Sequence, residues 1–190
     1  MKYELIGSRE PGAVPAALLA IAVPKQTDKK LPAELASYDA ASSGVLSRLF
    51  EGGDFTGAKD EVAHAYLTGE GPKRLLLVGV GKADDVGRTQ ARRAAAIAAR
   101  RAGTLGTGAI AFLMPATFRP TLGARDFAQA AAEGMGQGAW FFDEMKKPAE
   151  DRKPPVSSIA LVVDAAEQAE AGGGFALGQA VAEGQALTRR

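Results

Sequence analysis

Short, continuous apolar runs alternate along the chain with longer segments in which polar residues recur. Four of these runs cover residues 16–23, 75–80, 109–114 and 156–163. Each has the length of a strand, and most lack the alternation of a half-exposed one, which is typical of strands covered on both faces. A further strand is plausible at residues 2–6. The pattern predicts a sheet lying between layers of helices.

One segment has a different pattern. Residues 61–67 alternate His64 and Tyr66 with small apolar residues. The sequence Thr-Gly-Glu-Gly-Pro at residues 68–72 then separates this segment from the run at 75–80, and it is a good hairpin loop. One antiparallel pair is therefore predicted inside an otherwise parallel sheet.

Helices are expected between the strands. They are predicted at residues 31–50 (one or two helices, stopped by Gly52 and Gly53), 88–102 (ended by Gly103), 122–136 and 175–188.

Two local signals refine the last third of the chain. Asp164, with Glu167 three positions later, has the spacing of a helix-capping box. Three glycines at residues 172–174 predict a break before the final helix. Residues 146–155, rich in proline and charge, predict an exposed loop.

The composition fits one globular domain. The 190 residues are 46% hydrophobic and 24% charged, so the chain can bury a core without staples. The predicted fold class is α/β, with a mixed, mostly parallel sheet flanked by helices.

Cysteine content, net charge and targeting signals exclude several kinds of site and of cellular location. The chain has no cysteine, which excludes disulfides, thiolate metal sites and a cysteine nucleophile, and its net charge is +1. The start of the chain lacks a signal-peptide pattern, and the longest apolar run is far short of the ~20 residues that span a bilayer. We therefore expect a cytoplasmic protein with no membrane contact.

Common catalytic and phosphate-binding patterns are missing. The turn after the run at 75–80 has Asp84 where a dinucleotide fingerprint needs glycine, so a tight strand-to-helix turn is the favoured interpretation. His64 is the only histidine, which rules out a paired-histidine zinc site or a Ser–His–Asp triad within this sequence. No catalytic, cofactor-binding or metal-ligating residue is predicted in this chain.

The strongest local charge feature is the helix predicted at residues 88–102. Its alanines form one apolar arc, which would let the helix lie close to a sheet, and its arginines occupy the rest of the surface. These candidate nucleic-acid-binding residues are Arg88, Arg92, Arg93, Arg100 and Arg101. A solvated face is the competing interpretation, because no aromatic stacking platform accompanies the arginines in the sequence.

Three segments of the sequence form an ordered set. The first combines LFEGGDFTGAK at residues 49–59 with KRLLLVGVGK at 73–82. The second is AEGMGQGAWFFD at 132–143, and the third is AEGQALTRR at 182–190. Together they resemble the N-terminal domain of the leucyl (cytosol) aminopeptidase family, in which a tyrosine usually stands at the position of Trp140 and the third segment precedes the catalytic domain.

The resemblance implies a fold similar to macro domains, within a parent that releases N-terminal residues from peptides using two divalent ions, zinc or manganese. In the family these ions and the catalytic residues belong to a C-terminal domain with an NTDAEGR signature, and this chain contains no asparagine. Residues 1–190 are thus expected to form a single N-terminal accessory domain. Residues 175–190 would be the inter-domain helix leading to an absent catalytic domain.

The expected function is non-catalytic, in assembly or regulation, and the 190-residue chain alone is expected to be inactive. Its expected partners are its own catalytic domain and the other copies of a homo-oligomer, a hexamer in the family. Two alternatives stay open. One is a nucleic-acid-binding module that uses the arginine helix and has DNA as a partner, and the other is a macro-like binder of ADP-ribose.

Overall fold

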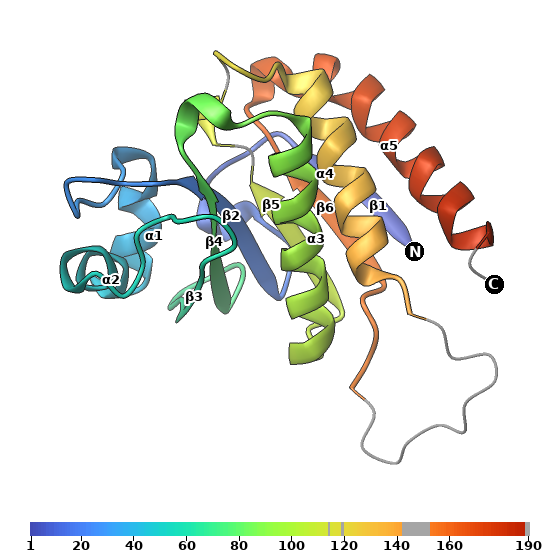
Figure 1. The fold of residues 1–190 in the computed structure, drawn as a ribbon. Coiled ribbons are helices and arrows are strands. Elements are labelled where there is room, and N and C mark those ends of the chain that lie inside the picture. Colours follow the sequence, from blue (N-terminus) through green and yellow to red (C-terminus); the bar gives the residue numbers. More distant parts are fainter. Residues whose placement is uncertain (114, 119, 142–152, 189–190) are drawn as a thin grey trace.

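The computed structural model describes residues 1–113, 115–118, 120–141 and 153–188, and it places six strands in one sheet (Figure 1). They are β1 (Lys2–Ile6), β2 (Leu18–Pro24), β3 (Val62–Tyr66), β4 (Arg74–Gly81), β5 (Ala109–Leu113) and β6 (Ser158–Val162). Their order in the sheet is β1-β6-β5-β2-β4-β3, and every neighbouring pair is parallel except β3 with β4. The predicted mixed, mostly parallel α/β fold and its antiparallel hairpin are confirmed.

The helices form two unequal layers. They are α1 (Ala36–Ala41), α2 (Val45–Gly52), α3 (Arg88–Leu105), α4 (Ala124–Ala139) and α5 (Gln168–Thr188). The long helices α3, α4 and α5 stand side by side on one face of the sheet, and the short α1 and α2 lie on the other (Figure 1). Short 3-10 turns include η2 (Ala33–Leu35), η3 (Ala83–Asp85), η4 (Ala116–Phe118) and η5 (Ala165–Glu167).

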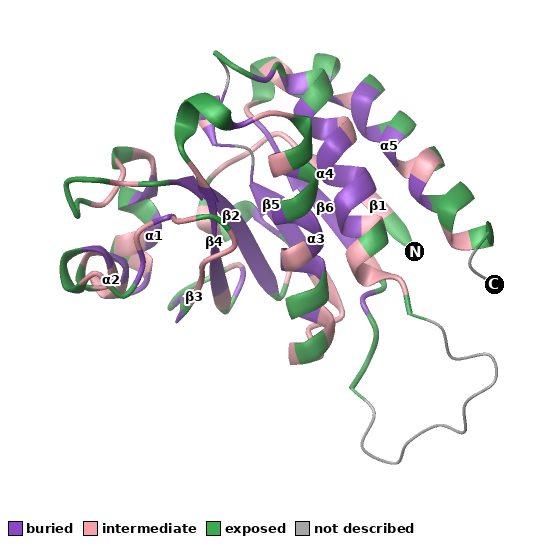
Figure 2. Cartoon of the chain, viewed as in Figure 1, coloured by how far each residue is buried: buried purple, intermediate pink, exposed green. Residues whose placement is uncertain are grey.

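Alternation along the central strands divides the core into two halves. In β2, Leu18 and Ala20 face the long helices, whereas Leu19 and Ile21 face α1 and α2. Both sets are buried, because the sheet is covered on both sides (Figure 2). This double coverage is why the central strands read as continuous apolar runs rather than alternating ones.

Small residues bring the long helices close together. The predicted alanine arc of α3 is buried, with Ala91, Ala95 and Ala98 fully enclosed. A Cβ atom added to Gly134 of α4 would overlap the backbone carbonyl oxygen of Arg92 on α3. The three-helix layer therefore depends on backbone contact that larger side chains would prevent.

Two helix-boundary predictions are wrong, and a third is right in position only. Helix α3 continues past Gly103 to Leu105, where Gly106 caps it in the left-handed conformation with φ of 70°. Helix α5 runs unbroken through the three glycines at residues 172–174. Asp164 is the N-cap residue of η5 as predicted, but its side chain makes no capping hydrogen bond and pairs with Arg9.

The three glycines stay helical for a tertiary reason. Gly174 faces α4, where an added Cβ would overlap the carbonyl oxygen of Arg125. Burial of α5 against α4 and β1 thus outweighs the low helix propensity of glycine.

Two sequence predictions meet the limits of the described chain. Most of the loop predicted at residues 146–155 lies outside the described residues, since 142–152 are not described. Within the part that is described, no helix is both long and apolar enough to cross a membrane.

Candidate functional site

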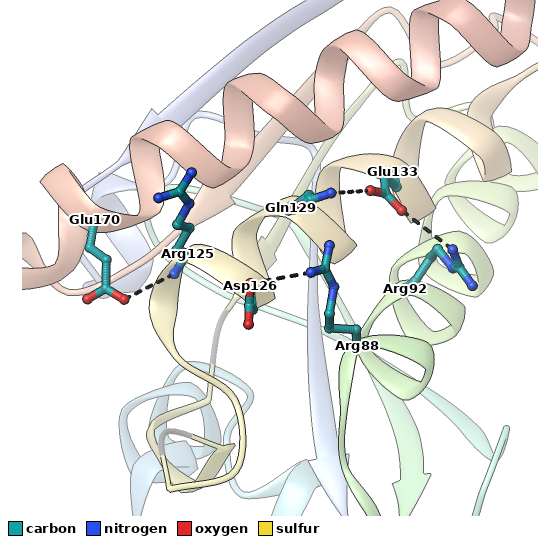
Figure 3. Close-up of polar contacts among 7 residues, drawn as sticks. All are labelled: Arg88, Arg92, Arg125, Asp126, Gln129, Glu133 and Glu170. Atoms are coloured by element: carbon teal, nitrogen blue, oxygen red, sulfur yellow. Dashed lines mark hydrogen bonds and ion pairs between the residues drawn. The ribbon is translucent and has the colours of Figure 1, made fainter.

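Three of the five predicted arginines are held in ion pairs within the domain. Nη1 of Arg88 lies 3.4 Å from Oδ1 of Asp126, and Nη1 of Arg92 lies 3.5 Å from Oε2 of Glu133, both across the α3–α4 contact (Figure 3). Arg93 makes two hydrogen bonds of 2.6 Å to the carboxylate of Asp60. The predicted phosphate-binding surface is therefore largely engaged by carboxylates of the same chain.

Glu133 sits at the centre of the polar contacts between α3 and α4. It is a buried charged residue, and its second oxygen accepts a hydrogen bond of 2.8 Å from Gln129 (Figure 3).

A further contact lies at the start of α4. The backbone N–H of Arg125 in the first turn of α4 lies 3.5 Å from a carboxylate oxygen of Glu170 on α5. A carboxylate there satisfies a free helix N–H group and complements the helix dipole. These contacts fix the relative positions of the three helices.

Asp60 gains charge stabilisation from its arginine. The bidentate hydrogen bonds from Arg93 hold the pKa of the Asp60 carboxyl below its ordinary value. Because Asp60 directly precedes the β3 hairpin, the pair ties α3 to the edge of the sheet. Asp60 and Arg93 lie 33 residues apart in the sequence, so no local sequence pattern indicates this ion pair.

The remaining two arginines, Arg100 and Arg101, lie on an exposed part of α3, and the charge of Arg101 acts on His64. Burial, followed by the positive charges of Arg74 and Arg101, lowers the pKa of His64. The His64 and Tyr66 rings are 5.1 Å apart edge to face, and the Arg74 guanidinium lies 5.8 Å from the centre of the Tyr66 ring. This basic–aromatic cluster (His64, Tyr66, Arg74 and Arg101) comes from three elements and was not foreseen from the sequence.

The first of the three family-like motifs, at residues 49–59 and 73–82, is held together by backbone hydrogen bonds. The Gly79 N–H donates to the carbonyl of Glu61 at 2.8 Å, and the Gly81 N–H donates to that of Gly57 at 3.0 Å. An added Cβ on Gly79 would overlap the carbonyl oxygen of Ala58. Two of the amides that a phosphate-binding turn would offer to a ligand are therefore already engaged within the domain.

The carboxylate of Glu61 holds the backbone of residues 56–58, which lie opposite Gly79. Glu61 accepts hydrogen bonds of 2.9–3.0 Å from the Thr56 N–H, the Thr56 hydroxyl and the Ala58 N–H. Burial raises the pKa of Glu61, but these hydrogen bonds outweigh it, and the pKa lies below its usual value. The motif residues are thus positioned for folding rather than for chemistry.

Side chains of the chain itself fill part of the carboxyl edge of the sheet, where α/β proteins commonly bind ligands. Arg9 forms an ion pair of 2.5 Å with Asp164 and lies 3.9 Å from Glu34. Glu34 in turn accepts hydrogen bonds from the Ala116 N–H and the Thr117 hydroxyl. This carboxyl-edge network (Arg9, Glu34 and Asp164) links the segments that follow β1, β2 and β6, and Glu34 joins them to the segment after β5.

The pocket beside the Gly79 end of β4 is small. It is lined by Lys59, Asp60, Gly79, Val80, Gln90, Arg93 and Ala94. Its volume of about 10 Å³ is room for a single water molecule. Ligand pockets are usually at least ~300 Å³, so this pocket cannot enclose a nucleotide such as ADP-ribose.

The described residues do not fit a metal centre. Among them, no three His, Asp or Glu side chains come together in a group able to hold a metal ion. Asp60 and Glu61, two carboxylates whose pKa values lie below their ordinary ones, are already bound to an arginine and to backbone amides.

Comparison with solved structures shows the same fold in larger proteins. A tomato leucine aminopeptidase mutant superimposes with a TM-score of 0.74 at 18% identity, over 97% of this chain and 36% of that one. The bottromycin maturation enzyme BotP, in complex with Mn, superimposes with a TM-score of 0.63 at 19% identity, over 92% of this chain and 31% of its own.

Sequence comparison gives closer relatives. A probable cytosol aminopeptidase of Pseudomonas aeruginosa is 31% identical over 97% of this chain and 37% of its own length. One from Acidithiobacillus ferrooxidans is 32% identical over 80% of this chain and 31% of its own length. The chain therefore spans about a third of the length of these relatives. The family described as cytosol aminopeptidase family, N-terminal domain, matches residues 20–149. The chain belongs to the cytosol aminopeptidase family, and it corresponds to the N-terminal domain of that family.

Proposed function

We propose that residues 1–190 form a single, non-catalytic accessory domain that supports the assembly or regulation of a leucyl-type aminopeptidase catalytic domain. The observation that carries the proposal is the match of most of the chain to the family's N-terminal domain, together with its limited share of the relatives' length. The parent protein would release N-terminal amino acids from peptides. It would act in the cytoplasm as a homo-oligomer, a hexamer in the proposal, with α5 as the inter-domain helix.

Two divalent ions, zinc or manganese, are proposed for the catalytic domain, where they would activate a water and polarise the scissile carbonyl. The Mn-bound BotP structure, which shares this fold, supports a metal in the parent. The described residues of this chain do not fit such a centre, so no step of the reaction is assigned to them.

The proposal is tested by assaying the 190-residue chain alone. Hydrolysis of leucine p-nitroanilide is measured with added Mn²⁺ or Zn²⁺, and the Pseudomonas aeruginosa relative serves as a positive control. We expect no turnover above the rate of the buffer with metal. Turnover that rises in proportion to the concentration of the chain would contradict a non-catalytic role.

The basic–aromatic cluster favours a second candidate function, the binding of single-stranded nucleic acid. The exposed Tyr66 offers a base a stacking surface, and Arg74 beside it and Arg101, which acts on His64, offer the phosphates positive charge. The ion pairs of Arg88, Arg92 and Arg93 restrict this candidate to the Arg101 end of α3.

This candidate predicts that the chain retains a fluorescent oligonucleotide at low salt. The double variant Tyr66→Ala/Arg101→Ala should weaken binding and reduce the salt slope by about 1, as expected for one lost phosphate contact. Arg88→Ala, an arginine already held by Asp126, is the matched control. Equal binding by all three proteins, or none at low salt, would eliminate this candidate.

A further inference from the structure

The two edges of the sheet differ in how they are protected. Among the described strands, β1 and β3 form these edges (Figure 1). An edge strand has backbone groups without a ladder partner, so proteins usually protect it with charges, proline, a bulge or a covering element. Strand β1 has such protection, because Lys2 and Glu4 form an ion pair of 2.9 Å and Phe175 of α5 packs against Tyr3.

Strand β3 has less protection. Its sequence, Val-Ala-His-Ala-Tyr, contains no proline, and its pairing with β4 runs without a bulge. Burial, followed by the charges of Arg74 and Arg101, lowers the pKa of His64, so the strand itself is uncharged at neutral pH. The edge is covered only past its end, where the Thr68 N–H donates to the Ala41 carbonyl at 2.8 Å.

The hydrogen-bond pattern identifies the backbone groups of β3 that point outward. The Leu67 N–H donates to the carbonyl of Lys73 on the β4 side at 3.0 Å. In an antiparallel pair, residues that bond the neighbouring strand alternate with residues that do not. Residues 63 and 65 therefore also face β4. The free edge of β3 consists of the outward N–H and C=O groups of Val62, His64 and Tyr66.

Positive charge lies beside this free edge on one face of the sheet. Ala65 is buried in the half of the core that contacts α1 and α2, so its neighbours His64 and Tyr66 point to the α3 face. The Arg74 guanidinium lies 5.8 Å from the centre of the Tyr66 ring, and Arg101 adds a second charge. Neither arginine forms an ion pair with a carboxylate of the described residues. Their charge is thus available to a ligand.

An extended peptide matches both features. Its backbone can pair with the free edge as an added strand, and its side chains then alternate between the two faces of the sheet. Acidic side chains would meet the basic–aromatic cluster on the α3 face, and small apolar ones would lie beside Ala63 and Ala65 on the other. A nucleic acid would use the charges and the tyrosine ring but would leave the backbone groups of the edge unpaired.

A second copy of the chain fits this edge less well. Antiparallel pairing of β3 with β3 of another copy would bring two basic–aromatic clusters together on one face, and like charges at that distance repel. We propose that the free edge of β3 binds an extended peptide segment in which acidic residues alternate with small apolar ones. This inference goes beyond the proposed function and does not depend on it.

The test measures how a short fluorescein-labelled peptide of alternating glutamate and valine binds to the 190-residue chain, by fluorescence anisotropy. In an added strand every second amide points toward β3 and the others point to solvent. Two N-methylated forms of the peptide are therefore compared, one methylated at the glutamate amides and one at the valine amides. They have the same side chains and charge, but each has lost a different set of donors.

We expect one methylated form to bind about as well as the parent peptide and the other at least about tenfold more weakly, because only one set of amides pairs with β3. Equal binding by the two forms would mean that charge alone holds the peptide, and it would overturn the inference. No binding of the parent peptide at low salt would also overturn it.

Substitution of His64 tests the same contact from the side of the protein. His64→Pro removes an outward N–H at a position where an edge strand tolerates proline, whereas His64→Ala loses the same side chain but keeps that N–H. We expect His64→Pro to bind the peptide at least about fivefold more weakly than His64→Ala. Equal binding would contradict pairing at this edge. Thermal unfolding checks that both variants are folded, and the methylated peptides test the contact in the unsubstituted chain.

Substitution of the arginines tests the charge. Arg101→Ala should weaken binding and reduce its salt dependence, and Arg100→Ala, the neighbouring arginine, should do so less. Equal effects would contradict a contact at the cluster. An oligonucleotide that binds more tightly than the peptide, and equally to His64→Pro and His64→Ala, would identify nucleic acid as the ligand and overturn the inference. A dimer in solution that His64→Pro abolishes would identify a second copy as the occupant and overturn it as well.

Discussion

At the scale of single residues, the chain uses its charged groups to fasten its own backbone. Glu61 holds the segment at residues 56–58, and Asp60 beside it holds Arg93 of α3. Both carboxylates have lowered pKa values, so their contacts favour the ionised form. The charges of Asp60 and Glu61 are therefore better explained by their structural partners than by a catalytic role.

Replacing Glu61 tests this explanation. Glu61→Gln should lower the free energy of unfolding at pH 7 by about 1–2 kcal/mol, since hydrogen bonds to a charged acceptor are lost or weakened. The folded-state pKa of Glu61 is lowered, so its stabilisation is present above the unfolded pKa of about 4.3 and disappears as pH falls through the folded value.

Urea unfolding at pH 7 and at about pH 3 measures the difference. Glu51→Gln, an exposed glutamate on α2, is the control and should change stability at neither pH. A Glu61→Gln deficit that stays the same at both pH values would show that the carboxylate charge is not what matters.

At the scale of elements, the three long helices pack through small residues, and α5 shows this most directly. Gly173 and Gly174 are neighbours in the same helix, one facing solvent and one facing α4. They are chemically identical, so a difference between them reports packing alone.

Gly174→Ala should destabilise the chain by about 1–3 kcal/mol, because the added methyl forces α5 away from the Arg125 carbonyl. Gly173→Ala should leave stability unchanged or raise it by up to about 1 kcal/mol through better helix propensity. Thermal and urea unfolding compare the two variants. Equal effects would mean that α5 does not lie against α4 as described.

A second pair compares the buried and the exposed side of α5. Phe175 is buried edge to face against Tyr3, with ring centroids 5.9 Å apart, so Phe175→Ala should cost about 3–5 kcal/mol. Leu177 is exposed, so Leu177→Ala should change the stability of the chain by no more than about 0.5 kcal/mol. Urea unfolding compares the two variants, and a large loss at Leu177 would place it in the core of the domain rather than on its surface.

These elements also show how far the sequence could predict the structure. The four apolar runs locate β2, β4, β5 and β6, because double coverage leaves a strong local pattern. The alternation at residues 61–67 and the loop at 68–72 predict β3 and the antiparallel hairpin. The glycines of α5 mislead, since their helical state depends on α4, and Gly174 lies 49 residues from the Arg125 carbonyl that it meets there. The partners of Arg88, Arg92 and Arg93 lie 33 to 41 residues away in sequence, so no local pattern could identify them.

At the scale of the whole molecule, the chain is a folded α/β domain whose polar groups mostly serve its own architecture. Its carboxyl edge is linked by Arg9, Glu34 and Asp164, and its glycine-rich turn is closed by backbone hydrogen bonds. The basic–aromatic cluster near Arg101 stands apart from this pattern. Under the proposed function, the domain supports chemistry that a catalytic domain carries out.

The most direct test is a rescue experiment on the Pseudomonas aeruginosa relative. Three proteins are compared in the leucine p-nitroanilide assay with Mn²⁺: the relative, the relative without the region that matches this chain, and the chimera that carries this chain in its place. The account predicts that the deletion loses most of the kcat/KM and that the chimera recovers it. A chimera no more active than the deletion, in a soluble preparation, would contradict the claim that this chain supports an aminopeptidase catalytic domain.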